Sequence, residues 1–421
     1  MLGIGGQASA AFRCAHIPAL RLLPFLSRGA RYRMNDPQDT RRMMIYLIVS
    51  NFLLYFGFQV WQTLFNNFAV ESVKIGPAEV GLVQAVREIP GLLGFLVGFL
   101  ALYLSEVRIM AFSIILMGVG IVATGYSTTL PILLVTTFVM SFGFHFFTPS
   151  TNAVVLMVSK LSEAPRALGK LGSLGSLAAV AATAAVYLLA RPWGYQTLFA
   201  VVGVLVMIGG VALFPLGGNG GTLPAKRRIV LRRRYWLYYA LSFLLGSRRH
   251  IFTTFAIYLL VREYHITVQT TAVLFLVNSL INIVTLRWVG QLVSRFGERI
   301  TLSVAFAALT FVFIGYAYIQ VLPLLYVLFV LDNIFIGFNL GLTTYFHKIA
   351  VSPEEITSNL SVEQTINHIA AIVIPVVGGT VWVAYGSQAP FIFGALIVLA
   401  ALALTQFMRP ARAPVAQPAA G

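Results

Sequence analysis

The sequence predicts an all-α integral membrane protein with twelve transmembrane helices in two pseudo-symmetric six-helix halves. Three observations support this fold class. First, the 421 residues are 58% hydrophobic and only 10% charged, with a mean hydropathy of +0.86, whereas about a quarter of the residues of a soluble domain are charged. Second, twelve apolar runs approach the roughly 20 residues that span a bilayer as a helix. Third, one long basic connection divides these runs six and six.

The apolar runs define the predicted domain organisation. Backbone polar groups must be paired in lipid, so we expect every run to be helical. The expected spans are residues 43–66, 79–103, 109–126, 131–158, 171–190, 195–215, 236–261, 270–289, 300–319, 323–347, 360–384 and 390–408. They form two halves, 43–215 and 236–408, joined by a basic linker, 216–235. We expect a disordered basic extension over residues 1–42, with Met34 as an alternative start, and a tail over 409–421.

The distribution of cations predicts the orientation of the chain. The linker carries six Lys and Arg residues and no acid, and most other cations lie in connections on the same side. Positive residues stay on the cytoplasmic side, so both termini and the linker are expected there, in a bacterial inner (plasma) membrane. The net charge of +16 lies between apolar runs and not on one face of a soluble domain. We therefore expect a lipid bilayer and no nucleic acid as partner, and a monomer.

Polar side chains follow one face of the first, fourth, seventh and tenth spans. A polar stripe in hydrocarbon must face protein or water, so these four helices are expected to line a central cavity. For any single amide, a hydrogen bond between helices is the alternative. The candidate pathway residues on these spans are Asn51, Gln59, Gln62, His145, Arg248, Arg249 and Asp332.

Three acids cannot easily be placed near water at the end of a span, namely Glu88, Asp332 and Glu363. Charged residues at bilayer depth are normally paired or functional. Glu88 follows Arg87, and since adjacent residues do not face each other on a helix, each is expected to have a partner elsewhere. They are either a gating ion pair or proton site, or a structural pair.

Asp332 is the predicted proton carrier because it lies deep in its span. Its counter-charge is expected to be Arg248 or Arg249, and Arg249 pairs either with it or with the substrate. The alternatives are a permanent structural ion pair, or an anionic substrate bound directly by these arginines. Among the histidines within spans, His368 is the best candidate for a proton or substrate role, because Gln364 precedes it by one turn.

The stretch from Gly290 to Arg299 is a polar connection between the eighth and ninth spans. It resembles the signature Gly-x-Leu-x-Asp-Arg-x-Gly-x-Arg of the major facilitator superfamily, with a serine in place of the acid. The expected gating residues are Gly290, Ser294, Arg295, Gly297 and Arg299. The corresponding first-half stretch, 192 residues earlier, keeps only Gly98 and Leu100 of the motif. We therefore expect the second copy to carry most of the inward gate.

This resemblance implies a secondary active transporter that works by alternating access. We predict a small organic solute as substrate and coupling to protons. The alternatives are a proton-independent organic-anion carrier or uniporter, and a transport-incompetent receptor or scaffold on the same fold. No phosphate-binding loop or catalytic constellation predicts an enzyme or a cofactor. With Cys14 as the single cysteine and no His/Cys cluster along the chain, we expect no metal site.

Overall fold

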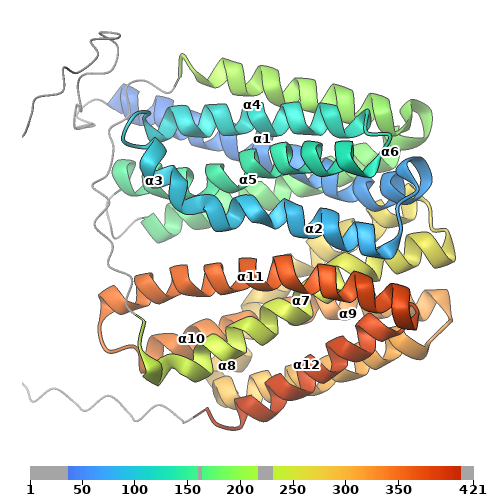
Figure 1. Cartoon of the computed structure of the whole chain (residues 1–421). Coiled ribbons are helices and arrows are strands. Elements are labelled where there is room, and N and C mark those ends of the chain that lie inside the picture. The colour runs from blue at the N-terminus through green and yellow to red at the C-terminus, as the bar shows by residue number, and fades with distance from the viewer. Residues whose placement is uncertain (1–36, 160–163, 217–230, 409–421) are drawn as a thin grey trace, which may run out of the picture.

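The computed structural model describes residues 37–159, 164–216 and 231–408, which are almost entirely helical (Figure 1). Most of the expected N-terminal extension, the linker from 217 to 230 and the tail from 409 lie outside the described residues. Residues 37–42, which we assigned to the extension, belong to the first helix. Within these described ranges, eight helical segments are long and apolar enough to cross a membrane.

The N-terminal half is built from helices that match the first six expected spans. Their bounds are α1 (Pro37–Phe68), which continues as a π-helical turn (Ala69–Val73), α2 (Pro77–Leu92), a 3-10 turn (Leu93–Phe95), α3 (Leu96–Leu100), α4 (Glu106–Gly125), α5 (Leu130–Val158) and α6 (Ala164–Leu213). α6 is broken at Gly194, which has a φ of 73°. This glycine divides α6 into the expected fifth and sixth spans.

The C-terminal half repeats this plan. Its helices are a 3-10 turn (Arg233–Tyr235), α7 (Trp236–Tyr264), α8 (Val268–Tyr318), α9 (Leu322–Ile336), α10 (Asn339–Ile349), α11 (Pro353–Tyr385) and α12 (Ala389–Thr405). α8 is broken at Gly297, where φ is 78°. The expectation of a ten-residue polar loop at Gly290–Arg299 is wrong, because the stretch is helical on both sides of this single glycine. The described helices are compatible with twelve spans.

Backbone conformations show the internal repeat directly. His265 lies 191 residues after Lys74, and both have positive φ at the end of the helix that opens their half. Gly386 lies 192 residues after Gly194, again both with positive φ. Positive φ is uncommon outside glycine, so its recurrence at nearly the same offset supports two pseudo-symmetric halves.

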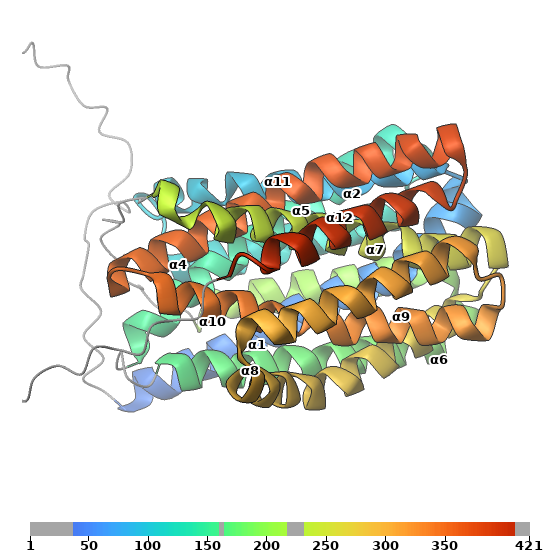
Figure 2. The same cartoon turned by 90° about the horizontal axis from the view of Figure 1, so that it is seen from below.

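The halves meet along α2 and α11, which lie side by side in both views (Figures 1 and 2). The backbones approach closely because glycines lie at the contact. A Cβ on Gly81 would be 2.1 Å from the Pro375 carbonyl oxygen, and one on Gly379 would be 2.7 Å from that of Pro77. Small residues commonly permit such close helix packing in membranes.

Hydrogen bonds between the halves gather at the end where α1 and α7 finish. The Tyr258 hydroxyl donates to the Ile75 carbonyl over 3.1 Å. The Asn67 amide donates to the Ile266 carbonyl over 2.9 Å and accepts from the Thr271 hydroxyl over 2.9 Å. The halves are thus joined at the end opposite the beginning of α1 and the end of α12 (Figure 1).

Candidate functional site

A central cavity of about 710 Å³ lies between the two halves. The four helices expected to line it do so, as α1, α5, α7 and α9. Three further helices, α2, α8 and α11, also contribute, and the polar-stripe argument missed them. The signal for two of them was present in the sequence, since Glu88 and His368 lie within their spans.

The structure brings most of the candidate pathway residues to one cavity. Those that line it are Gln59, Gln62, Arg87, Glu88, His145, Arg249, Asp332 and His368. Asn51 is not among them, and its amide donates to the Leu47 carbonyl of its own helix over 2.8 Å. Arg248 lies behind the wall, fully buried. Most of the predicted pathway residues therefore line the cavity, whereas Asn51 and Arg248 do not.

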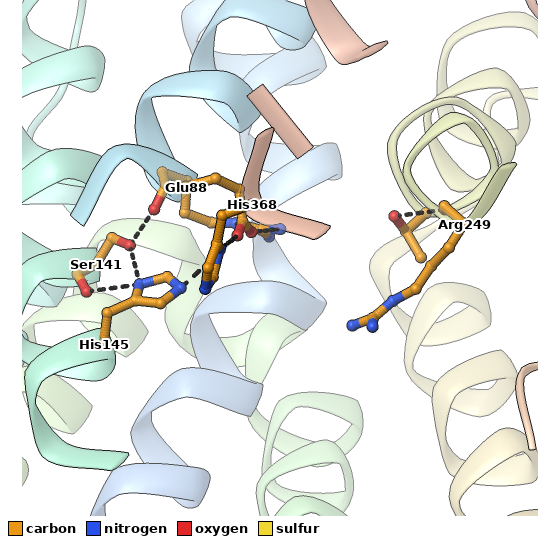
Figure 3. Close-up of polar contacts among 7 residues, drawn as sticks. Glu88, Ser141, His145, Arg249 and His368 are labelled. Carbon is orange, nitrogen blue, oxygen red and sulfur yellow. Dashed lines mark hydrogen bonds and ion pairs between the residues drawn. The ribbon is translucent and has the colours of Figure 1, made fainter. Parts of the chain in front are cut away.

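Glu88 is the centre of a polar cluster contributed by three helices (Figure 3). Arg87 Nη2 lies 2.8 Å from Glu88 Oε1. His368 Nδ1 of α11 lies 3.0 Å from Glu88 Oε2, and His145 Nε2 of α5 lies 3.7 Å from the same oxygen. We expected Glu88 and Arg87 each to have a partner on another helix. This is true of Glu88, but it is wrong for Arg87, because its long side chain folds back and places the guanidinium on the neighbouring carboxylate.

Ser141 orients His145 toward Glu88. Its hydroxyl donates to the Arg87 carbonyl and lies 2.9 Å from His145 Nδ1. His145 Nδ1 is also 3.0 Å from the Ser141 carbonyl, so this nitrogen carries the hydrogen. In the neutral imidazole, Nε2 then presents a lone pair toward the carboxylate.

His368 is arranged in the opposite sense. Because its Nδ1 faces the Glu88 carboxylate, Nδ1 is the donor when Glu88 is ionised. Among the described residues, its buried Nε2 has no hydrogen-bond partner. Two imidazoles and one carboxylate therefore share a site in which a proton can be added at more than one atom.

The same three side chains place their ligand atoms within 4.8 Å of one another, as a metal site requires. Our expectation that the histidines form no such cluster is wrong, since helix packing joins residues far apart in sequence. The surrounding charge nevertheless opposes a metal cation, because Arg87 already binds the carboxylate and Arg249 lies within electrostatic reach.

Asp332 forms an ion pair with Arg248, not with Arg249. Arg248 Nη1 lies 2.7 Å from Asp332 Oδ1, and the side chains are 2% and 0% exposed. Both residues belong to the C-terminal half, on α7 and α9. Sequence alone left both arginines open as partners, because neighbouring residues on a helix differ in direction by about 100° and only packing selects one.

Arg249 points into the open space opposite the Glu88 cluster (Figure 3). It lines the central cavity and a smaller cavity of about 200 Å³ between α7, α10 and α11. Within the part of the chain that is described, no carboxylate lies at ion-pair distance from its guanidinium.

The predicted gating residues contact their own half. Arg299 donates to the Gln406 side chain, with Nη2 3.2 Å from Oε1, and Ser294 donates to the Gln291 carbonyl. Arg295 stacks over the Phe296 ring, with its guanidinium 5.2 Å from the centroid. Next to Gly297, Glu298 pairs with Lys348 of α10 over 2.6 Å. Gly290 packs near Leu340, 3.8 Å from where a Cβ would lie.

The sequence profile of the Major Facilitator Superfamily matches residues 47–361, about three quarters of the chain. The chain belongs to this superfamily. Among solved structures, it is similar to the nucleoside transporter NupG, with 17% identity and a TM-score of 0.70 over 87% of this chain and 99% of that one. It is also similar to the inward-facing, occupied form of a bacterial homologue of the human lysosomal transporter Spinster, with 14% identity and a TM-score of 0.73 over 88% and 97%. A search of curated protein sequences finds no match.

Membership of the major facilitator superfamily confirms the predicted fold and the resemblance. The protein is an integral, multi-pass membrane protein and a secondary transporter of a small molecule. At these levels of identity, the two solved structures show the fold alone.

Proposed function

We propose that this transporter moves a small organic solute by alternating access coupled to protons, and that the Glu88 cluster carries the proton. The supporting observation is the 3.0 Å contact between Glu88 and His368. It joins α2 to α11 within the cavity, and thus joins the N-terminal half to the C-terminal half.

A contact between the halves is where a proton can control their movement. Alternating access rocks one half against the other around a central site. The groups that face Glu88 are Arg87 on its own helix, His145 on α5, His368 on α11 and, at longer range, Arg249 on α7. Adding a proton to the carboxylate or to an imidazole changes the strength of the contact across the halves, and so favours one conformation over the other.

The Asp332–Arg248 pair is less suited to this role, so we propose Glu88 and its histidines as proton carrier in place of Asp332, which the sequence predicts. Its two members lie in one half, so the rocking movement does not require the pair to break. Each is almost completely buried, and an uncompensated buried charge is strongly destabilising. We propose a structural role for this pair and a solute-facing role for Arg249.

The distribution of contacts supports an inward-facing arrangement, and we propose a bacterial inner membrane as the location of the protein. If the basic connections lie in the cytoplasm, the end that is sealed by Asn67, Tyr258 and Thr271 faces outward. The beginning of α1 and the end of α12 lie on the opposite side (Figure 1). Both termini are then cytoplasmic, as the cation distribution predicts.

The test is Glu88→Gln in proteoliposomes, with a solute identified by a thermal-stability screen. We expect the wild type to accumulate the solute under an imposed pH gradient. Glu88→Gln should lose most of this accumulation but keep exchange of solute against solute, because exchange requires no net proton movement. Matched pH-driven accumulation by the two proteins would overturn the assignment.

Solute flux and thermal stability of the wild-type protein are sufficient to distinguish the alternative functions. Flux that is indifferent to pH gradients and to uncouplers indicates a proton-independent organic-anion carrier or uniporter. Solute-dependent stabilisation without any flux indicates a receptor or scaffold. The same vesicles therefore test both alternatives.

A further inference from the structure

We propose that the solute is an aromatic organic anion whose carboxylate binds Arg249 and whose ring lies against an aromatic wall on α1 and α5. This inference rests on the proposed transport function and names its substrate class. It is built from three independent features of the cavity, which are its charge, its wall and its unpaired amide oxygens.

The first feature is an uncompensated positive charge. Of the charged groups in or directly behind the cavity wall, Arg87 pairs with Glu88 and Arg248 with Asp332. Arg249 is partly buried and has no carboxylate at ion-pair distance among the described residues. Glu363 lines the smaller cavity that Arg249 also borders, but its carboxylate accepts a hydrogen bond from the Tyr238 hydroxyl and it does not line the central cavity. The central cavity therefore carries one excess positive charge in a partly buried position, which favours one negative charge on the solute and disfavours a cation.

The surroundings of Arg249 suit a carboxylate. Its planar guanidinium can donate two parallel hydrogen bonds to two oxygens. Gln364 and Asn367 of α11 line the same two cavities as Arg249, and their amides supply further donors. An anion at this position contacts α7 and α11 together.

The second feature is the aromatic wall, defined by Tyr55, Phe58 and Phe144. All three line the cavity and are half-buried. Phe58 stacks on Phe144 with ring centroids 4.1 Å apart. Tyr55 is held from behind, since a Cβ on Gly175 would lie 2.8 Å from its ring. Fixed rings of this kind favour a flat, polarisable partner by stacking or edge contacts, and the cavity of about 710 Å³ is large enough for it.

The third feature is a pair of unsatisfied acceptors. The side-chain oxygens of Asn66 and Asn278 are buried without a hydrogen-bond partner among the described residues. Both residues line the cavity and are less than 10% exposed. Unpaired buried acceptors are costly, so hydroxyl or amino substituents on the ring are favoured because they can supply the missing donors.

The experiment measures binding to the purified full-length protein by calorimetry, with naphthoate as the probe. Naphthamide has the same shape without the charge, and decahydronaphthoate has the charge without the flat ring. We expect naphthoate to bind, naphthamide to bind about tenfold or more weakly, and decahydronaphthoate several-fold more weakly. A hydroxylated naphthoate should bind more tightly than naphthoate itself.

Two variants test the residue. Arg249→Gln should weaken naphthoate binding about tenfold or more while leaving naphthamide unaffected. Arg191→Gln, which removes an exposed arginine on α6, is the matched control and should bind as the wild type does. If Arg249→Gln does not fold, binding of the three probes to the wild type still tests whether the site requires an anion and a flat ring.

Several outcomes overturn the proposal: no binding of naphthoate by the wild type, equal binding of naphthamide, or equal naphthoate binding by the two arginine variants. Binding needs no pH gradient, so this test is separate from that of proton coupling. Naphthoate binding without pH-driven flux would contradict the proposal of proton coupling but would still support the proposed substrate class.

Discussion

At the scale of single residues, two charged pairs of different character lie in or directly behind the cavity wall. The carboxylate of Glu88 is shared by an arginine of its own helix and two histidines of other helices. That of Asp332 has one partner, Arg248, and both side chains are nearly inaccessible. At Glu88 a proton can be added to a neighbouring histidine, which leaves the carboxylate paired with Arg87, whereas a proton added to Asp332 leaves Arg248 buried without a counter-charge.

A charge-neutralising double substitution tests the structural role of the second pair. Asp332→Asn alone leaves Arg248 buried without a counter-ion and should destabilise the protein by about 3–5 kcal/mol. Asp332→Asn combined with Arg248→Gln removes both charges and should lose much less. The measurement is the apparent unfolding temperature in detergent, together with pH-driven solute accumulation in vesicles. A well-folded double variant that has lost pH-driven accumulation would restore Asp332 as the proton carrier.

The sequence predicted which residues belong to the site better than it predicted which of them contact one another. Glu88, Asp332 and His368 stood out because ionisable groups in a span are rarely accidental. The choice between Arg248 and Arg249 depends on rotation about the α7 axis, which sequence does not determine. The cluster of Glu88, His145 and His368 depends on the packing of three helices, so no spacing along the chain reveals it.

At the scale of elements, α7 and α11 are joined where each begins. Glu355, in the first turn of α11, accepts a hydrogen bond from the Tyr235 hydroxyl and pairs with Arg232. Tyr235 also accepts a hydrogen bond from the Val351 amide. These residues precede the apolar parts of both helices, and Arg232 lies in the described part of the linker. The contact thus ties the linker to the connection between α10 and α11.

The pH dependence of stability tests this junction. The hydrogen bond from Tyr235, aided by Arg232, lowers the pKa of Glu355 below its ordinary value. A carboxyl with a lowered pKa in the folded state stabilises the protein above its ordinary pKa, about 4.3, and this stabilisation is lost as pH falls through the folded-state value. Tyr235→Phe should therefore lower the unfolding temperature at pH 7 more than at strongly acid pH. An equal loss at both pH values would contradict the assignment.

The glycines of the α2–α11 contact provide a second test at this scale. Gly81→Ala places a methyl group against the Pro375 carbonyl, so the helices must separate, at a cost of about 1–3 kcal/mol. Gly172→Ala in α6, where no atom lies within 4 Å, is the control and should be neutral or slightly stabilising because alanine favours helix. The comparison is of apparent unfolding temperatures. Equal behaviour of the two variants would show that α2 and α11 are not tightly packed.

At the scale of the whole molecule, hydropathy and cation placement predicted the all-helical fold, and the partial copy of the Gly290–Arg299 motif 192 residues earlier indicated its internal repeat. The positive-φ pairs Lys74 with His265 and Gly194 with Gly386 confirm that repeat at the backbone. The connections themselves were harder to predict. A single glycine turn at Gly297 replaces the expected loop, because polar composition does not distinguish a loop from helix ends that extend beyond the membrane.

The measurement that tests the central claim most directly is the number of protons exchanged when the solute binds. Calorimetry in buffers of different ionisation enthalpy gives this number without a membrane. If Glu88 and its histidines carry the coupled proton, the wild type exchanges protons on binding and Glu88→Gln binds the solute with little or no exchange. An undiminished proton exchange in Glu88→Gln would contradict the claim.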